Sequence, residues 1–144
     1  MFNNQDEEIA YGIRNLVTIM NKRLRKQMSN PEQLSIAEFN VLSILMIQKE
    51  AFPSELGAQL SISSQFMSQI LNRMEGLKYI SRKSAPSDGR KTLVSLTKQG
   101  KQKVELSRRE REEWLALMVS EKYTTEEKDV IKKALDLLSV LTEL

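Results

Sequence analysis

The sequence predicts a mainly helical fold in which a short β-hairpin follows a helix-turn-helix. Apolar residues recur at steps of three and four along most of the chain, which indicates amphipathic helices. Two of the predicted helices are short and are separated by only about three residues, as in a helix-turn-helix. Residues 82–97 break the helical pattern with turn formers followed by a β-branched and apolar run, which is typical of a hairpin.

Composition favours one folded unit and excludes several functions. The chain has 144 residues, of which 40% are hydrophobic and 28% are charged, so it can bury a real core. Cys and His are both absent. Disulfides and thiolate metal sites are therefore excluded, and the usual imidazole base and metal ligand are missing. No nucleophile–base pair or phosphate-binding glycine loop is visible, so we expect no enzyme, no cofactor and no metal.

The sequence also predicts a cytoplasmic protein without a membrane partner. The longest apolar run, residues 39–47, is interrupted by Asn40 and Ser43 and is too short to span a bilayer. Residues 1–8 are polar and acidic, unlike a signal peptide.

The first predicted helix is amphipathic and ends at Asn30-Pro31. Its apolar stripe consists of Ile9, Ile13, Leu16, Met20 and Leu24. Ser35 is predicted to cap the next helix, residues 36–49, and Glu38 stands three residues on, where it would complete a capping box.

The helix-turn-helix is predicted in the middle of the chain. Pro53 stands at a permitted first-turn position of a short helix that runs to Leu60. Residues 61–63 form a tight turn, and Ser63 caps a second helix over residues 64–78. The buried stripe of this helix is Met67, Ile70, Leu71 and Met74, in which the methionines are interpreted as core rather than as a ligand pocket. The opposite face carries Ser64, Gln65, Ser68, Gln69, Asn72 and Arg73.

Two further helices follow the hairpin. Thr97 is predicted to cap a long charged helix, and Thr124 with Glu127 forms a capping box for the last one. The last helix carries an apolar stripe that ends at Leu141. The apolar stripes at the two ends of the chain either complete the core or pair with those of a second subunit.

Positive charge is concentrated around the predicted hairpin. The net charge of the chain is only +3, so its distribution matters more than its sum. Between residues 73 and 103 the only acidic residues are Glu75 and Asp88. The basic residues of the same segment are Arg73, Lys78, Arg82, Lys83, Arg90, Lys91, Lys98, Lys101 and Lys103. A basic patch therefore coincides with the hairpin.

The last three lysines of this segment begin the long charged helix. A cation at a helix N-terminus opposes the helix dipole, so a phosphate partner is one interpretation of Lys98, Lys101 and Lys103. Solubility is the other, and the sequence leaves both open.

These features together favour double-stranded DNA as the partner. A helix with short polar side chains fits the major groove, where Asn or Gln can pair with adenine and Arg with guanine. Arg90 at the hairpin tip can enter a narrow minor groove, with Asp88 either bracing its guanidinium or capping the turn. Taken alone, each feature is equally consistent with an ordinary solvated surface. Their order in the chain favours DNA, because the helix and the hairpin can then reach adjacent grooves.

The ordered motifs resemble the MarR family of winged-helix regulators over nearly the whole chain. The matching residues are Met74-Glu75, Tyr79-Ile80, Asp88-Gly89-Arg90 and Leu96-Thr97-x-x-Gly100. The resemblance implies a single unit, residues 1–144, with dimerisation helices in residues 1–30 and 101–144. It places a winged helix-turn-helix DNA-binding lobe at residues 33–100.

The resemblance further implies a homodimer that binds a pseudo-palindromic operator, usually as a repressor released by a small, often aromatic, ligand. Helix 63–78 would be the recognition helix in the major groove, and residues 82–96 would be the wing in the minor groove. The alternative is a winged-helix protein-interaction module that has lost specific DNA binding. The candidate DNA-contacting residues are Pro53, Ser54, Ser63, Ser64, Gln65, Ser68, Gln69, Asn72, Arg73, Lys83, Ser87, Asp88, Gly89, Arg90 and Lys91.

Two positions depart from the family pattern. The glycine that commonly ends the recognition helix is Lys78 here, so a left-handed cap would be strained or would be replaced by another termination, with Gly76 loosening the last turn. Ser68-Gln69 stands where threonine and arginine are common, which changes the contacts expected with phosphate or guanine.

Overall fold

The computed structural model describes residues 1–143 and divides the chain into two units. One unit is Met28–Arg109, and the other joins Met1–Gln27 to the chain from Glu110 onward. The predicted DNA-binding lobe, residues 33–100, lies inside the first unit, which we call the winged lobe. The second is called the helical unit.

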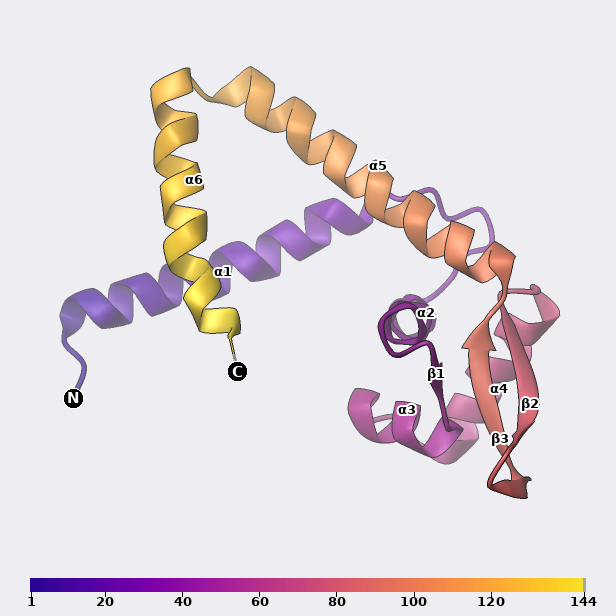
Figure 1. Cartoon of the computed structure of the whole chain (residues 1–144). Helices are drawn as coiled ribbons and strands as arrows, with labels where there is room; N and C mark the ends of the chain where they lie inside the picture. Colours follow the sequence, from indigo (N-terminus) through magenta and orange to yellow (C-terminus); the bar gives the residue numbers. More distant parts are fainter. Residues whose placement is uncertain (144) are drawn as a thin grey trace. The chain divides into compact units, whose positions relative to one another are not determined.

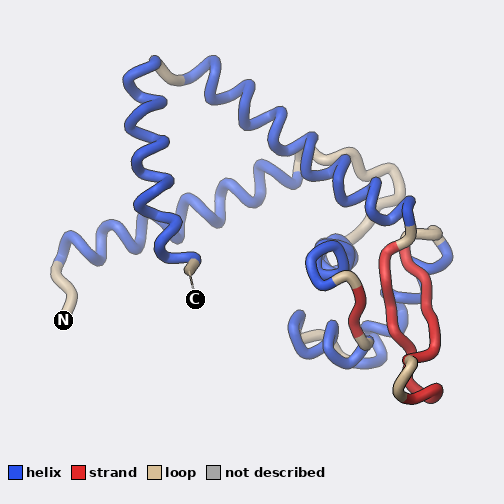
Figure 2. Tube along the Cα trace, in the orientation of Figure 1, coloured by secondary structure: helices blue, strands red, loops and turns tan. Residues whose placement is uncertain are grey.

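The mainly helical fold with a small antiparallel sheet confirms the predicted fold class (Figures 1 and 2). The elements are α1 (Asn4–Arg25), α2 (Ile36–Gln48), β1 (Glu50–Ala51), α3 (Pro53–Leu60), α4 (Ser64–Gly76), β2 (Ile80–Ala85), β3 (Asp88–Leu96), α5 (Lys98–Lys122), α6 (Thr125–Ser139) and the short 3-10 helix η1 (Val140–Thr142). Within residues 1–143, no helix combines the length and the apolarity that a bilayer crossing requires.

The predicted helix caps are confirmed, with one exception. The side-chain oxygens of Ser35, Ser63, Thr97 and Thr124 each accept a hydrogen bond from the backbone N–H three residues on. Thr124 and Glu127 form the complete capping box that was expected. The box predicted at Ser35 is wrong in its second half, because the carboxylate of Glu38 binds Arg73 instead.

The sheet has the order β1-β3-β2, and both pairings are antiparallel. The hairpin turn is formed by Pro86 and Ser87, two residues before the Asp88-Gly89 pair that is typical of such turns, and Gly89 has no positive φ. Pairing passes directly from Ser84 with Thr92 to Ala85 with Asp88. Gly89, Arg90 and Lys91 therefore have no paired residue on β2, which makes the tip of the hairpin irregular.

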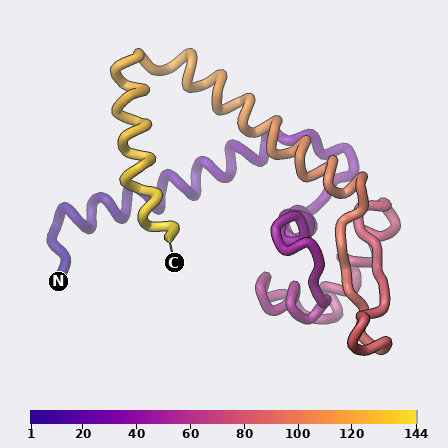
Figure 3. The backbone as a smooth tube through the Cα atoms, viewed as in Figure 1, coloured from indigo at the N-terminus to yellow at the C-terminus, as the bar shows by residue number. Residues whose placement is uncertain are grey.

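One hydrophobic core holds the winged lobe together. The predicted stripe of α4 is confirmed: Met67, Ile70, Leu71 and Met74 are all buried. They pack with Leu42 and Leu45 of α2, Leu56 of α3 and Val94 of β3, among others. Burying each such side chain contributes about 1.5–3 kcal/mol. Figure 3 follows this chain path through α3, α4 and the hairpin. The core thus fixes the helix-turn-helix and the hairpin as one body.

The helical unit has a different character. No residue of α1 or of α6 is buried in the described chain. Large apolar side chains are exposed along both helices, including Ile9, Leu16 and Ile19 of α1 and Val130, Leu135 and Leu137 of α6. Extensive exposed apolar surface of this kind marks an interaction site in a folded protein.

Candidate nucleic-acid interface

The turn between α3 and α4 fixes where the second helix begins. Ser61 adopts a left-handed conformation with φ of 54°, and the N–H of Ile62 donates to the carbonyl of Gly57 at 2.9 Å. A Cβ added at Gly57 would lie 3.0 Å from the carbonyl oxygen of Ile62, so a small residue suits this close turn. Ser63 then caps α4, as described above.

One face of α4 is polar and exposed. Ser64, Gln65, Ser68, Gln69 and Asn72 are all exposed, as the sequence predicted, and they lie opposite the buried stripe. The sequence interpretation missed Phe66, a residue that is 46% exposed beside them. The sequence could have indicated that Phe66 is exposed, because this residue falls outside the spacing of the buried stripe. This face therefore offers hydroxyl, amide and aromatic groups to a partner.

The end of α4 settles the alternatives raised by Lys78. Lys78 adopts the left-handed conformation, with φ of 65°. Its N–H donates to the carbonyl of Glu75, and the N–H of Tyr79 donates to the carbonyl of Met74, both at 2.9 Å. This is a Schellman motif with lysine in the place of glycine. The helix ends at Gly76, two residues before the predicted end. Of the two predicted terminations, the left-handed cap at Lys78 is therefore the one that forms.

Thr97 and Gly100 join this helix end to the start of α5. The Thr97 hydroxyl donates to the carbonyl of Lys78 at 2.5 Å, and its N–H donates to the carbonyl of Tyr79 at 3.0 Å. A Cβ at Gly100 would lie 2.0 Å from the carbonyl oxygen of Tyr79. The Leu-Thr-x-x-Gly motif thus holds the start of α5 against the segment that links α4 to β2.

The hairpin tip presents exposed basic side chains. Arg90 and Lys91 are exposed, and the N–H of Arg90 donates to the Asp88 carboxylate at 3.0 Å. Asp88 therefore caps the turn, which is one of its two predicted roles. The Lys91 ammonium lies 5.6 Å from the centroid of the Phe52 ring, at the start of α3. This contact brings the hairpin and the first helix of the helix-turn-helix together.

Arg82 connects the hairpin to α4. Its Nη2 donates to Oδ1 of Asn72 at 2.7 Å, and its Nε lies 3.7 Å from the carboxylate of Glu75. Asn72 and Glu75 are three residues apart and so share a helix face. The sequence interpretation placed Arg82 only in the basic patch. Its structural role depends on the register between β2 and α4, which the sequence does not show.

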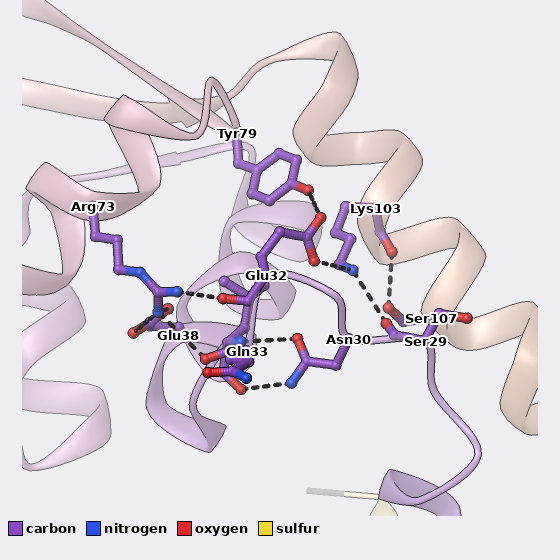
Figure 4. Close-up of polar contacts among 10 residues, drawn as sticks. Ser29, Asn30, Glu32, Gln33, Glu38, Arg73, Tyr79, Lys103 and Ser107 are labelled. Carbon is purple, nitrogen blue, oxygen red and sulfur yellow. Dashed lines mark hydrogen bonds and ion pairs between the residues drawn. The ribbon is translucent and has the colours of Figure 1, made fainter.

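Arg73 does not extend freely from the polar face of α4. Its Nη1 donates to both carboxylate oxygens of Glu38, at 2.8 and 2.6 Å, and to the carbonyl of Gln33 at 3.5 Å. Its Nη2 donates to the carbonyl of Glu32. Figure 4 shows the guanidinium turned toward α2 and the preceding loop. Of the candidate residues in α4, Arg73 alone has its charge committed to an ion pair in the described chain.

The side chain of Glu32 is a second polar centre (Figure 4). It accepts hydrogen bonds from the Tyr79 hydroxyl and, at 2.9 Å, from Nζ of Lys103. The bond from Tyr79, supported by Lys103, lowers the pKa of Glu32 to about 2, although burial opposes it. Burial and the bond to Glu32 raise the pKa of Tyr79 to about 12. The carboxylate is therefore charged and the phenol neutral at any physiological pH.

Four cations of the predicted basic patch are paired with acids. Arg73 pairs with Glu38, Arg82 with Glu75, Lys83 with Glu50, and Lys103 with Glu32. Lys103 is only 7% exposed, so the interpretation of this residue as a phosphate partner is wrong. Three of the four acids come from outside residues 73–103, which is why counting charges in that segment overstated the patch. The hairpin tip retains its positive charge.

The remaining candidates lie at the edges of these two surfaces. Pro53 and Ser54 open α3, and Ser54 is exposed. Ser87 forms the hairpin turn with Pro86 and is exposed. Within residues 1–143 no group of three or more acidic side chains is placed to hold a metal ion.

The fold and this surface define a winged helix-turn-helix protein of the kind that binds DNA. Comparison with known proteins places it further: the model of the MarR family matches residues 32–91. Over this region the chain resembles the transcriptional regulators of the MarR family, which carry a helix-turn-helix. The proteins of this family that it matches are regulators and not enzymes.

Individual relatives are similar to this chain over nearly its whole length. An uncharacterized HTH-type transcriptional regulator of Mycobacterium bovis is 26% identical over 97% of this chain and 96% of its own. A solved structure from Pseudomonas aeruginosa, described as a transcriptional regulator, has a TM-score of 0.83 and 29% identity, and the match covers 99% of both chains. A point mutant of S. aureus MepR, solved bound to an oligodeoxyribonucleotide, has the same fold, with a TM-score of 0.70 and 22% identity over 98% of this chain and 99% of that one.

Proposed function

We propose that the protein is a homodimeric, sequence-specific repressor that inserts α4 into the major groove of operator DNA and the hairpin tip into the minor groove. The observation that carries this proposal is the pairing of two exposed surfaces on one rigid core. These are the polar face of α4 and the unpaired, basic segment Gly89–Lys91. A further observation is that the MepR mutant, which shares this fold, is bound to DNA in its solved structure.

On this proposal the face of α4 selects the sequence and the hairpin tip adds affinity. Ser64, Gln65, Ser68, Gln69 and Asn72 would meet base edges or phosphates, and Phe66 would contact a thymine methyl group. Arg90 would enter the minor groove, where the potential is most negative in narrow stretches. Phosphate contacts would come from Ser63, from Pro53-Ser54 at the start of α3, and from the wing residues Ser87, Lys91 and Lys83, the last exchanging its exposed ion pair with Glu50 for a phosphate.

Dimerisation is supported by the helical unit. The exposed apolar side chains of α1 and α6 have no core of their own within the described chain, and a second copy would bury them. A symmetric dimer also presents two copies of α4 to a pseudo-palindromic operator.

A small aromatic effector would bind in the winged lobe. A pocket of about 310 Å³ is lined there by Pro31, Tyr79 and Leu106, with Ser29, the amides of Gln99 and Gln102, and the ion pair of Glu32 and Lys103 beside them. An apolar wall with a few polar groups suits a small aromatic ligand. The probe is benzoate: it should weaken the DNA complex of the wild type but not that of Leu106→Asp. DNA binding that ignores saturating benzoate would contradict this choice of ligand site and leave the DNA proposal intact.

A salt-dependent mobility-shift assay tests the DNA proposal. The duplexes are the upstream region of the protein's own gene and a random sequence of equal length and composition. We expect the upstream region to bind at least about a hundredfold more tightly, and both affinities to fall as salt rises. Equal binding of both duplexes, or none, would favour the protein-interaction module instead.

A further inference from the structure

Arg73 stands on the recognition helix but turns its charge toward the body of the winged lobe. Glu38, its main partner, is only 8% exposed, and both of its carboxylate oxygens accept from Nη1 of Arg73. The Arg73 side chain itself is 42% exposed. The pair therefore lies at the rim of the core, with the acid inside and the base covering it.

This ion pair joins three separate parts of the fold. Arg73 belongs to the last turns of α4, and Glu38 belongs to the first turn of α2. The carbonyls of Glu32 and Gln33, in the loop before α2, accept from the same guanidinium. The Glu32 side chain is in turn held by Tyr79 and Lys103. The acceptors of Arg73 are thus themselves fixed in place (Figure 4).

Such a contact does what apolar packing alone does not. The buried stripe of α4 holds the helix against the core, but the hydrophobic attraction itself has no preferred direction. A charge-assisted bond between a planar guanidinium and a carboxylate is directional. Arg73 therefore restricts the rotation of α4 at the end remote from Ser64.

We propose that Arg73 is a positioning residue: its bond to Glu38 sets the orientation in which α4 presents its polar face to DNA, and Arg73 itself makes no essential phosphate or base contact. The proposal rests on the DNA-binding function argued above. It replaces the sequence-based expectation that Arg73 reads the groove directly.

The two roles predict opposite effects of the substitution Glu38→Gln. If Arg73 positions the helix, weakening its partner loosens α4 and lowers DNA affinity. If Arg73 contacts DNA, the same substitution removes a negative charge near a polyanion and frees the guanidinium, so affinity rises.

The experiment measures the Kd for the preferred duplex over a range of KCl concentrations, at a temperature where circular dichroism shows every variant folded. Glu38→Gln and Arg73→Lys should each weaken binding about tenfold, as for one lost charge-assisted hydrogen bond. The slope of log K against log salt should stay at its wild-type value, since no phosphate contact is lost. Arg90→Ala serves as the contrast and should reduce that slope by about one per protomer.

Two further variants control for unrelated causes. Arg108→Lys alters an ion pair of the same length, with Glu105 at 2.6 Å, that is exposed and lies within α5, and it should leave DNA affinity unchanged. The double variant Arg73→Gln with Glu38→Gln should bind DNA more tightly than Arg73→Gln alone, because it no longer leaves a buried carboxylate without its partner.

A measurement on the wild type needs no variant at all. Labelling with an arginine-specific dicarbonyl should modify Arg73 much more slowly than Arg90 in the free protein. Equal labelling rates, tighter DNA binding by Glu38→Gln, or a slope lowered by Arg73→Gln as it is by Arg90→Ala would each overturn the positioning role. Failure of the wild type to prefer any duplex would instead overturn the proposed function, and this inference with it.

Discussion

The α-carbon of Gly100 faces the backbone carbonyl of Tyr79 so closely that a side chain there would overlap it: a Cβ would lie 2.0 Å from the oxygen and 3.2 Å from Cδ2 of Leu96. The obstacle is backbone, which cannot swing aside. The contact therefore requires glycine for steric reasons, independently of any φ value.

Gly100→Ala should destabilise the protein by about 1–3 kcal/mol, the usual range for overpacking a close contact. Urea unfolding followed by circular dichroism measures this loss. Gly76→Ala is the matched control, because a Cβ there meets nothing within 4 Å. It should stabilise α4 by up to about 1 kcal/mol. Equal effects of both substitutions would show that the Tyr79 contact is not restrictive.

Lys78→Gly should stabilise the protein by about 1 kcal/mol. The left-handed conformation of Lys78 is costly for a residue with a Cβ and nearly free for glycine, and this gain exceeds the extra entropy of glycine in the unfolded chain. The free energy of unfolding in urea tests it. Lys78→Ala keeps the Cβ and removes the charge, so a similar gain from alanine would assign the effect to charge rather than to backbone.

Glu32→Gln should cost stability in a pH-dependent way. The pKa of Glu32 is lowered from 4.5 to about 2 in the folded protein, so the carboxylate stabilises the fold above pH 4.5 and this contribution is lost as pH falls toward 2. The difference in unfolding free energy between wild type and variant should be constant near neutral pH and shrink below 4.5. A constant difference down to pH 2 would contradict the lowered pKa.

The stability that Tyr79 contributes depends on pH in the opposite direction. Its pKa is raised from 10.0 to about 12, so the neutral phenol stabilises the fold fully below pH 10, and this contribution is lost as pH rises through 12. Tyr79→Phe should therefore differ from wild type by a constant amount below pH 10, and the two should converge above it. Spectrophotometric titration of the folded protein locates the transition directly.

Arg90→Ala should weaken DNA binding by about 1–3 kcal/mol while leaving the melting temperature unchanged, because the side chain is exposed and its backbone N–H keeps the bond to Asp88. The mobility-shift assay and a thermal melt measure the two quantities. Lys22→Ala, an exposed charge of α1, should change neither. A lower melting temperature with unchanged affinity would make Arg90 a structural residue.

Leu137→Glu should convert the proposed dimer into a folded monomer. Leu137 is 71% exposed within one copy, so a charge there costs the isolated chain little, whereas burying it against a second copy would be costly. Sedimentation at micromolar concentration distinguishes the two species. A wild-type chain that sediments as a monomer would reject the dimer itself.

Features that depend on a few neighbouring residues could be predicted from the sequence. The N-cap of Ser63 and the buried spacing of Met67 and Met74 are set by local hydrogen bonding and helical periodicity, and both are confirmed. The hairpin itself was predicted, but its turn lies at Pro86 and Ser87, two residues before the Asp88-Gly89 pair that signals it. Asp88 favours a turn wherever its carboxylate can accept from the N–H two residues on, and that requirement is equally met at the first residue of β3.

Features that join distant segments could not be predicted in this way. Arg73 and Glu38 are 35 positions apart, and each had a reasonable local interpretation, as a groove-facing cation and as part of a capping box. Their pairing follows only from the packing of α4 against α2, which brings a half-exposed base over a buried acid. Lys103 is similar, since its partner Glu32 lies in a loop that sequence periodicity does not describe.

The irregular tip of the hairpin has a consequence for how such a protein can diversify. Because Gly89, Arg90 and Lys91 are paired with nothing on β2, residues can be exchanged, added or removed there without disturbing the ladder that begins at Ser84 and Thr92. The paired part of the hairpin and the core stay constant, and the sequence of the tip can vary. Change in groove preference can therefore accumulate at the tip while the fold that carries it stays constant.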